Sequence, residues 1–392
     1  MPESPFRVLH LGKFFPPHPG GIERFVADLA AAQAAQGMAV RVLAHAEPGG
    51  WRSRHFRMGG VEVDLAACHG QFVYAPVSPS FPRLLARAID AFKPDVVHIH
   101  MPNTSAFWAL LSRAARHLPW VVHWHADIPL DTRRRALRMA YRLYRPWEQA
   151  LLRRARVVIA TSQAYADSST ALAPWRDKVH AIALGLPDWP ASDSANSTDW
   201  PAPGLRLLGV GRQSYYKGFD VLLRALARVP EASLVLVGDG ECAGSLHALA
   251  AELGLGSRVR FAGNIDDAAL AAAYAQADAF CLPSTDRAES FGIVLLEAMR
   301  AGLPVIASDI PGSGVGIVVG RKESTGLLIP PNDPAALVAA MRRLAADMDL
   351  RRRLGAAARQ RFLREFTLDR VTPQVTDVYR QTLARGTSSP AP

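Results

Sequence analysis

Cysteine is scarce in this sequence, and the few that occur support neither a disulfide framework nor a zinc knuckle. Among 392 residues there are only Cys68, Cys242 and Cys281, far apart and without any Cys-x-x-Cys pair. No uninterrupted apolar run approaches the roughly 20 residues that a membrane-spanning helix requires. The first residues, Met-Pro-Glu-Ser-Pro, lack the basic and apolar segments of an export signal. We therefore expect a cytoplasmic protein, either soluble or peripheral to a membrane.

Acidic residues are outnumbered by basic ones. Lysine and arginine number 45 against 35 aspartates and glutamates, which gives a formal net charge of +10. This charge suits an anionic partner and leaves nucleic acid, a phosphorylated ligand and an acidic lipid surface open. The length is too great for one ordinary core and sufficient for two.

Short β-branched runs alternate with helical segments, which indicates α/β architecture with doubly wound parallel sheets. Between two such series, a stretch dense in turn-forming residues predicts a linker. We predict an N-terminal domain over 1–190, a linker over 191–204, a C-terminal domain over 205–365 and a last helix over 366–385. Strands are expected at 7–11, 40–44, 95–100, 120–125 and 157–161, and then at 205–210, 233–237, 259–261, 279–282 and 304–307.

The loop over residues 15–23 joins the first predicted strand to the first helix. Gly20 and Gly21 allow a ligand to approach the backbone, and the start of the helix offers free N–H groups to an anion. An ordinary strand–helix turn explains the same residues. The loop is not a G-x-G-x-x-G fingerprint, which argues against a dinucleotide-dependent dehydrogenase.

A second loop, over residues 211–220, follows the first strand of the C-terminal domain. It contains Arg212 and Lys217, and both cations can reach one diphosphate from this position. The alternative is a pair of solvated surface cations.

The most specific pattern places two carboxylates eight positions apart. Glu289 is expected in a loop and Glu297 two turns inside the following helix, which Ser290 can cap. Glu297 is surrounded by apolar residues in the sequence, and a glutamate in such a setting needs a partner or a ligand.

The 289–305 segment resembles the signature of the retaining family-four glycosyltransferases of the GT-B fold. It has the two glutamates at the family spacing, Phe-Gly after the first, and Gly-x-Pro-Val after the second. The 211–218 loop, the Val-Gly-Asp-Gly run at 237–240 and the 326–334 segment match the same family in the same order. The resemblance extends from Gly20 to about Tyr379. It implies two facing Rossmann-like domains with a cleft between them, the first binding the acceptor and the second the nucleotide sugar, and a last helix that crosses back to the first domain.

The resemblance also implies a role for each matching residue. Arg212 and Lys217 would bind the donor diphosphate and stabilise it as a leaving group. Glu297 would accept hydrogen bonds from the ribose, and Glu289 would orient the transferred sugar. Catalysis would further involve His125. The remaining implied donor-binding positions are Gly20, Gly21, Ser290, Phe291, Gly292 and Ile293, and the implied acceptor-binding positions are His125 and Asp127.

The run His-Trp-His-Ala-Asp-Ile at 123–128 resembles a bacterial subgroup that builds O-antigen and other surface polysaccharides. This resemblance implies a hexosyltransferase that moves mannose or rhamnose from a GDP-sugar, rather than a UDP-sugar, to a polyprenyl-linked or saccharide acceptor. A Gly-Thr-Gly-Thr-Ser run of the subgroup is matched only in part by the Gly-Ser-Gly-Val-Gly at 312–316. No cofactor and no metal are expected, because no aspartate pair suited to a diphosphate-bound metal is apparent.

Paired histidines leave a competing hypothesis open. His98 and His100, and likewise His123 and His125, lie two apart on predicted strands, so each pair faces one side of its strand. A metal site, and with it a metal-dependent hydrolase, is therefore conceivable. Histidines at strand ends beside an anionic ligand need no metal, however.

The segment over 133–156 is rich in arginine, with aromatic and leucine residues between the arginines and Glu148 as its one acid. A basic amphipathic helix of this kind is typical of proteins that lie on an anionic membrane surface. A helix packed on its own domain with a solvated basic face explains the pattern equally well. Nucleic-acid binding is a non-enzymatic rival, but no binding module accompanies the arginines and the two glutamates would remain unexplained.

Overall fold

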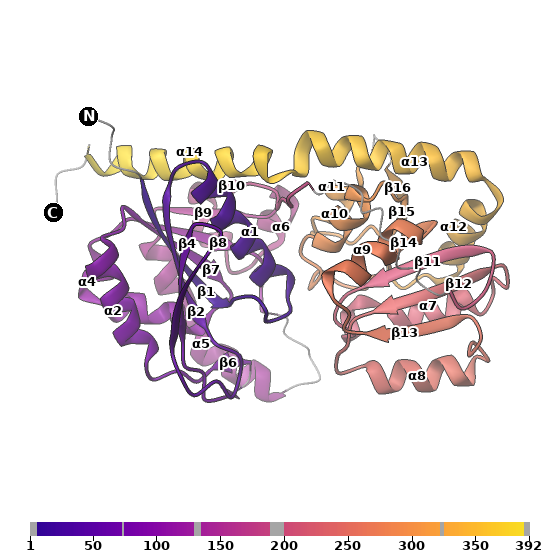
Figure 1. Cartoon of the computed structure of the whole chain (residues 1–392), viewed down its shortest axis with the longest axis horizontal. Coiled ribbons are helices and arrows are strands. Elements are labelled where there is room, and N and C mark those ends of the chain that lie inside the picture. Colours follow the sequence, from indigo (N-terminus) through magenta and orange to yellow (C-terminus); the bar gives the residue numbers. More distant parts are fainter. Residues whose placement is uncertain (1–5, 73, 129–134, 189–199, 322–324, 388–392) are drawn as a thin grey trace. The chain divides into compact units, whose positions relative to one another are not determined.

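The computed structural model describes residues 6–72, 74–128, 135–188, 200–321 and 325–387, which form two compact units (Figure 1). Unit 1 comprises Met1–Gly185 and Leu368–Pro392, and unit 2 comprises Leu186–Thr367. Most of the predicted linker lies outside the described residues. The last helix, α14 (Leu368–Thr387), belongs to unit 1 although it follows unit 2 in the sequence.

Unit 1 is built on one sheet with the strand order β10-β9-β8-β7-β1-β2-β4-β3. The neighbours are parallel, as predicted for a doubly wound sheet, except for the edge strand β3, which pairs antiparallel to β4. The strands are β1 (Arg7–Phe14), β2 (Ala39–His45), β3 (Arg54–Met58), β4 (Val61–Ala66), β7 (Val96–Met101), β8 (Trp120–Trp124), β9 (Val157–Ala160) and β10 (Val179–Ala181). The short hairpin of β5 (Gln71–Phe72) and β6 (Ala75–Pro76) stands apart from this sheet.

The helices of unit 1 include α1, which begins at Gly21 directly after the 15–20 loop, as the sequence predicts. They are α1 (Gly21–Ala35), α2 (Phe81–Phe92), η1 (Thr104–Phe107), α3 (Trp108–Leu111), α4 (Arg113–Arg116), α5 (Arg135–Arg154), α6 (Gln163–Ser168), η2 (Ala173–Lys178) and α14. Arg133 and Arg134 of the arginine-rich segment lie outside the described residues.

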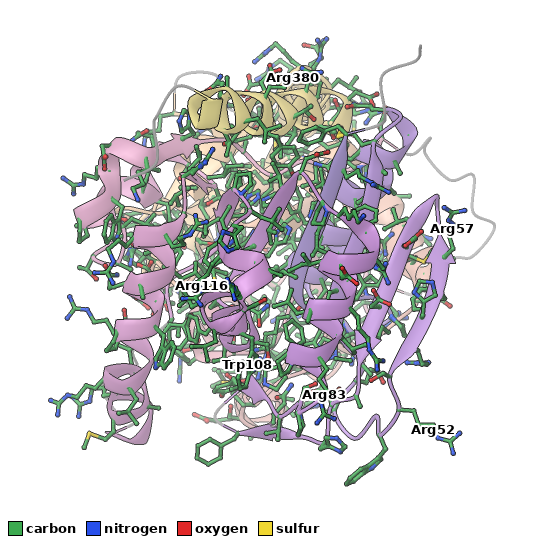
Figure 2. The ribbon with its side chains drawn as sticks, turned by 90° about the vertical axis from the view of Figure 1, so that its left-hand side faces the viewer. Arg52, Arg57, Arg83, Trp108, Arg116 and Arg380 are labelled. Carbon is green, nitrogen blue, oxygen red and sulfur yellow. The ribbon has the colours of Figure 1, made fainter. Side chains whose placement is uncertain are left out.

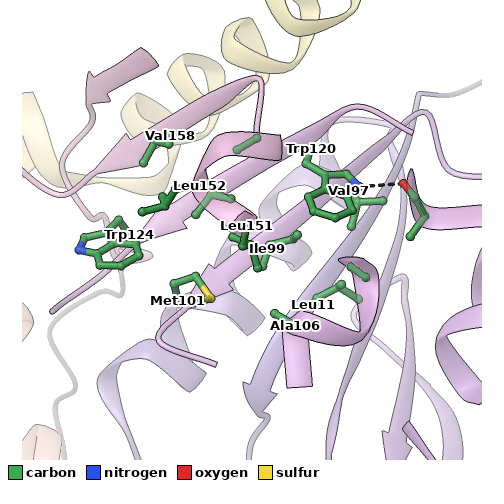
Figure 3. Packing of buried hydrophobic residues seen from close by; sticks show 14 of the residues in the cluster. Leu11, Val97, Ile99, Met101, Ala106, Trp120, Trp124, Leu151, Leu152 and Val158 are labelled. Atoms are coloured by element: carbon green, nitrogen blue, oxygen red, sulfur yellow. Dashed lines mark hydrogen bonds between the residues drawn. The ribbon is translucent and has the colours of Figure 1, made fainter. Parts of the chain in front are cut away.

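The central strands of unit 1 have one apolar face and one histidine face. On β7 and β8, alternate residues such as Val97, Ile99 and Trp120 enter a core of large apolar side chains (Figure 3). The Trp120 indole N–H donates to the Ala115 carbonyl oxygen at 2.8 Å, so this buried polar group is satisfied. Because side chains alternate between the two faces of a strand, the intervening histidines all point to the opposite face.

Unit 2 contains a six-stranded parallel sheet with the order β13-β12-β11-β14-β15-β16, the strand order of a Rossmann fold. Its strands are β11 (Leu205–Val210), β12 (Ala232–Val237), β13 (Val259–Gly263), β14 (Ala279–Leu282), β15 (Val305–Ser308) and β16 (Gly326–Ile329). Its helices are η3 (Tyr215–Lys217), α7 (Phe219–Leu226), α8 (Ala243–Glu252), α9 (Asp267–Gln276), α10 (Ile293–Arg300), α11 (Val315–Val319), α12 (Pro334–Ala346), α13 (Met348–Arg361) and η4 (Phe362–Phe366).

The chain order of the sheet in unit 2 reverses between β11 and β14. In open α/β sheets, ligands bind at the carboxyl ends of the strands at this switch point. The loops that follow β11 and β14 carry Lys217 and Glu289 respectively. The fold therefore brings two separate sequence motifs to the expected position of a ligand.

Candidate active site

A glycine allows the loop after β11 to lie directly against the end of β14. Gly218 has a φ of +67°, and a Cβ atom there would lie 2.1 Å from the carbonyl oxygen of Pro283. Any other residue would push the loop away and would strain the backbone. The backbone N–H of Thr285 also donates to the Tyr216 carbonyl oxygen at 2.7 Å. These contacts hold Lys217 beside the segment that contains Glu289.

Lys217 and Glu289 form a buried ion pair. The Lys217 Nζ lies 2.7 Å from the Glu289 Oε2, and the Ser284 hydroxyl donates to the same oxygen at 2.9 Å. Burial lowers the pKa of Lys217, but Glu289, Tyr216 and Glu297 together raise it more, so the net shift of the pKa is upward. The lysine therefore stays cationic at neutral pH. The prediction that both residues serve one site is consistent with this geometry.

Helix α10 begins directly after this pair. Gly292 is its N-cap, with a φ of +78°, and no side chain caps the helix. The expectation that Ser290 caps α10 is therefore wrong, because the left-handed turn at Gly292 performs the chain reversal. The first backbone N–H groups of the helix have no intrahelical acceptor and carry partial positive charge. Together with the N–H groups of the 290–292 turn, they are the expected anion-binding groups.

The 312–316 segment, which matches the motif of the bacterial subgroup only in part, supports the 290–292 turn. The Ser313 hydroxyl donates to the Glu289 carbonyl oxygen, and the Gly314 N–H donates to the Ser290 carbonyl oxygen at 2.8 Å. Sequence reasoning noted the 312–316 run but assigned it no role. The structure shows that it fixes the backbone of the glutamate loop.

The other two predicted donor residues of unit 2 lie in different environments. Arg212 is exposed and pairs with Glu241, with a nitrogen–oxygen distance of 3.2 Å. Exposed pairs of this kind contribute little stability, so the guanidinium is available to an anion at small cost. Glu297 is half-buried on α10 and accepts a hydrogen bond from the Tyr274 hydroxyl at 2.8 Å. Glu297 was expected to have a partner, and this partner is Tyr274. Sequence reasoning did not identify Tyr274.

In unit 1, Gly20 and Gly21 lie exposed at the start of α1. A Cβ atom at Gly20 would lie 2.0 Å from the Glu23 Oε2, so the glycine leaves room for that carboxylate. Burial raises the pKa of Glu23. This carboxylate beside the predicted anion-binding loop was not foreseen from the sequence.

A layer of buried imidazoles lies between the sheet of unit 1 and helices α1 and α14. It comprises five residues from three adjacent strands, His10, His98, His100, His123 and His125. The four histidines predicted to face one side are brought together as expected. His10 was missed, although its position opposite His98 in the strand register follows from the same alternation. We call these five residues the histidine layer.

Hydrogen bonds in the histidine layer run in one direction. The Gln33 side-chain carbonyl accepts from His10 Nε2 at 2.8 Å, so the proton of neutral His10 is on Nε2 and Nδ1 is an acceptor. His100 Nε2 therefore donates to His10 Nδ1 at 3.0 Å. By the same logic, His125 Nε2 donates to His100 Nδ1 at 3.0 Å. The Nδ1 of His125 is an acceptor that has no donor among the described residues.

The amide group of Gln33 also reaches the last helix. It donates to the Tyr379 hydroxyl at 2.9 Å, and this hydroxyl donates to His98 Nδ1 at 2.6 Å. Residues from α1, α14 and the central strands are thus joined through one buried glutamine. Gln33 sets the tautomers of the layer, and through them the tautomer of His125.

The layer is uncharged at neutral pH. Burial lowers the pKa of His10 to about 4 and that of His125 to about 3. Burial, together with the neighbouring imidazoles, lowers the pKa of His98, His100 and His123 well below the ordinary value.

Two overlapping triads, His10–His98–His100 and His100–His123–His125, offer ring nitrogens within 4.8 Å of one another. A metal ion at either triad would need a nitrogen of His100. Both nitrogens of His100 already take part in hydrogen bonds, so a metal would have to displace one of them. Neither triad includes a carboxylate among the described residues to offset the charge of an ion. We interpret the layer as a hydrogen-bonded network.

The two predicted acceptor residues follow β8. The ring of His125 is only 2% exposed and lies in the histidine layer. Asp127 accepts hydrogen bonds from the Trp124 indole at 2.8 Å and from the Ser169 hydroxyl at 2.7 Å. Asp127 therefore anchors the loop after β8, and its predicted contact with an acceptor stays a prediction.

Replacing Gln33 by leucine should destabilise unit 1, because His10 Nε2 would lose its acceptor and the Tyr379 hydroxyl would lose one of its two hydrogen-bond partners. Each buried polar group left unpaired costs about 1–3 kcal/mol. Urea unfolding followed by tryptophan fluorescence measures the change. The control is Gln36→Leu at the exposed end of the same helix. A change below about 0.5 kcal/mol, the usual size for surface substitutions, would contradict the network.

Comparison with known proteins covers both units. The family described as "Glycosyl transferases group 1" matches residues 193–361, and the "Glycosyl transferase 4-like domain" matches residues 20–185. The chain is 32% identical to the phosphatidyl-myo-inositol mannosyltransferase of Mycobacterium leprae over 380 residues, which covers 94% of this chain and 95% of that protein. The chain belongs to the group 1 glycosyl transferases.

Other relatives share most of their length with this glycosyltransferase. O-antigen chain mannosyltransferase C of Escherichia coli is 30% identical, with 95% of this chain and 98% of the relative covered. D-rhamnosyltransferase WbpZ of Pseudomonas aeruginosa is 33% identical, with 92% of each covered. These matches give no support to a metal-dependent hydrolase.

The structural match shows the fold. The structure of HepE from Anabaena in complex with UDP and glucose aligns with a TM-score of 0.73 at 20% identity, covering 96% of this chain and 100% of that one. The glycosyltransferase therefore has the predicted GT-B fold, with two Rossmann-like domains. Within the part of the chain that the structure describes, no helix has the length and apolar character needed to cross a bilayer.

Proposed function

We propose that this glycosyltransferase is a retaining hexosyltransferase that moves mannose or rhamnose from a GDP-sugar to a lipid-linked or saccharide acceptor. The observation that carries the proposal is the buried pair of Lys217 and Glu289 at the start of α10. A buried cation beside unpaired helix N–H groups is an environment suited to the diphosphate of a nucleotide sugar.

The names of the relatives support the proposed sugar. Three of them, from different bacteria, are named as mannosyltransferases or as a D-rhamnosyltransferase. A GDP-linked donor is the interpretation that agrees with the motif at 123–128. HepE was solved with UDP, so a UDP-sugar is the competing donor that an experiment must include.

The acceptor is proposed on similar grounds. One relative is named for O-antigen chains and one for phosphatidyl-myo-inositol. The first of these names is that of a glycan chain, and that of phosphatidyl-myo-inositol is the name of a lipid. A polyprenyl-linked saccharide used in surface polysaccharide synthesis is the acceptor that we propose.

In the proposed reaction, the bond between the sugar C1 and the diphosphate oxygen breaks, and a bond from C1 to the acceptor oxygen forms on the same face. The acceptor proton passes to the departing diphosphate. Lys217 and Arg212 stabilise the charge that develops on the diphosphate, and Glu289 positions the sugar hydroxyls. Glu297 holds the ribose. These groups supply the positive charge themselves, so we propose that no metal and no cofactor is needed.

A transfer assay tests the proposal. Purified protein is incubated with GDP-mannose, GDP-rhamnose or UDP-glucose and with a synthetic polyprenyl-diphosphate-linked saccharide, with and without EDTA. We expect transfer from a GDP-sugar, unaffected by EDTA, with the anomeric configuration of the donor kept in the product, as read by proton NMR. Inversion of that configuration, or transfer that EDTA abolishes, would contradict the proposal.

A further inference from the structure

Helix α5 carries a stripe of apolar side chains that are exposed in the described structure. Met139, Leu143 and Trp147 are 60%, 77% and 43% exposed. They are spaced four residues apart, which places them on one side of the helix. The adjacent face of α5 is packed on unit 1, since Leu151 and Leu152 belong to its core and the Tyr144 ring lies 5.0 Å from that of Phe107. The stripe is therefore not part of the core of unit 1.

The stripe continues onto a neighbouring element. The Phe107 ring stacks on Trp147 with a centroid distance of 6.2 Å, so the end of η1 lies against α5. The next residues form α3, where Trp108 and Leu111 are both exposed. We call Met139, Leu143, Trp147, Trp108 and Leu111 together the apolar face. It lies beside the loop that follows β7, the strand next to the one that leads into His125.

An exposed hairpin adds to this surface. Strand β6 packs against η1, and the hairpin exposes Phe72 and Tyr74. Trp51, with its ring 4.7 Å from that of His69, is exposed on the loop after β2. Aromatic side chains that are apolar at one end and polar at the other favour the interface between a bilayer and water.

Arginines surround the apolar face. Arg138, Arg142 and Arg145 are exposed on α5, and Arg116 is exposed on α4. The only acid in the sequence of α5 is Glu148, which is buried and accepts a hydrogen bond from Tyr141 at 3.0 Å. In Figure 2, Trp108 lies below Arg116 in the view, and Arg52 and Arg57 project from the right-hand edge of unit 1.

The residue composition of this surface favours an anionic bilayer over a nucleic acid or a neutral surface. A nucleic acid would use the arginines but has no place for exposed methionine and leucine side chains. A neutral surface would offer no negative charge for the arginines to bind. On α5, exposed aliphatic and aromatic side chains are interleaved with arginines, and the acid of this helix, Glu148, is buried. This composition matches the acyl boundary and the phosphates of an anionic bilayer.

We propose that the apolar face and its arginines dock this glycosyltransferase onto an anionic bilayer, with Met139, Leu143 and Trp147 entering the headgroup region. The inference rests on the proposed function, because a lipid-linked acceptor would then be presented at the strand ends of unit 1 without leaving the membrane surface.

Vesicle co-flotation tests the proposal. Wild-type protein is mixed with vesicles of phosphatidylcholine alone or with about one third phosphatidylglycerol, at low and at high salt. Binding should be at least tenfold stronger to the anionic vesicles and should weaken with salt. Leu143→Glu should lower it at least tenfold, and so should the triple change Arg138→Gln, Arg142→Gln and Arg145→Gln. Equal binding to both vesicle types, or full binding of Leu143→Glu, would overturn the proposal.

Matched controls separate docking from folding. Leu363→Glu alters an exposed leucine of unit 2, and Arg380→Gln removes an exposed arginine of α14, and neither should change vesicle binding. Thermal unfolding should be the same for all variants. A preference of the wild type for a DNA duplex over anionic vesicles would also overturn the proposal. Stabilisation by nucleotide should be unchanged in Leu143→Glu, so the failure of docking and the failure of the donor site give different results.

Discussion

Lys217→Ala should lower kcat/KM by about 10²–10³-fold, a loss of the size seen when one preorganised transition-state contact is removed. The lysine is buried beside Glu289 and remains cationic, so in the proposed reaction its charge meets the departing diphosphate in a site with little water. Steady-state kinetics with the donor identified by the transfer assay measure the change. Arg224→Ala, which removes an exposed cation of α7, is the matched control and should retain full activity.

The same substitution should destabilise unit 2, because it leaves the Glu289 carboxylate buried without its cation. Breaking a buried ion pair costs about 3–5 kcal/mol. The double variant Lys217→Ala with Glu289→Gln removes both charges and should recover much of that stability, but it should recover no activity. If the double variant regained activity along with stability, Lys217 would have a structural role only.

Acidification should unfold unit 1 steeply between about pH 6 and pH 4.5. The folded pKa values of the histidine layer lie far below the ordinary value of 6.5, at about 4 for His10 and about 3 for His125. Between these values the unfolded chain binds more protons than the folded chain, so the free energy of unfolding falls as the pH falls. Five imidazoles acting together give a slope on the order of 5 kcal/mol per pH unit. Glu148 opposes this trend, because burial raises its pKa to about 7.

Urea unfolding at several pH values, with the proton uptake measured by calorimetry in buffers of different ionisation enthalpy, checks the slope. His123→Phe should reduce the proton uptake by about one, since both ring nitrogens of His123 lack a hydrogen-bond partner in the described structure. A proton uptake near zero at pH 5.5 would contradict the neutral histidine layer.

The sequence predicts the central strands well because their signal is local. Runs such as 96–101 and 157–160 are short, β-branched and bounded by turns. Four strands of the two main sheets, β3, β4, β10 and β16, were missed, and so was the short β5–β6 hairpin. Strand β3 is largely exposed at the edge of its sheet, and β10 and β16 are short strands at sheet edges. Their pairing depends on neighbours that are distant in the sequence.

Sequence motifs identify some residues of the candidate site, and the structure is needed to bring them together. The contact of Lys217 with Glu289 spans 72 positions, and only the reversal of strand order between β11 and β14 brings the two together. The supporting residues Ser284, Ser313 and Tyr274 carry no pattern of their own. The bond between Gln33 and Tyr379 joins residues 346 positions apart, and only the return of α14 to unit 1 reveals it.

The most direct test of the central claim, a diphosphate site at Lys217 and α10, is thermal unfolding in the presence of GDP, UDP or ADP, with and without EDTA. A nucleotide at a hundred times its dissociation constant adds about 2.7 kcal/mol to the stability of the state that binds it. We predict stabilisation by GDP that EDTA does not change and that Arg212→Ala and the double variant at Lys217 and Glu289 abolish. Stabilisation by none of the nucleotides, or stabilisation that survives in the double variant, would contradict the account.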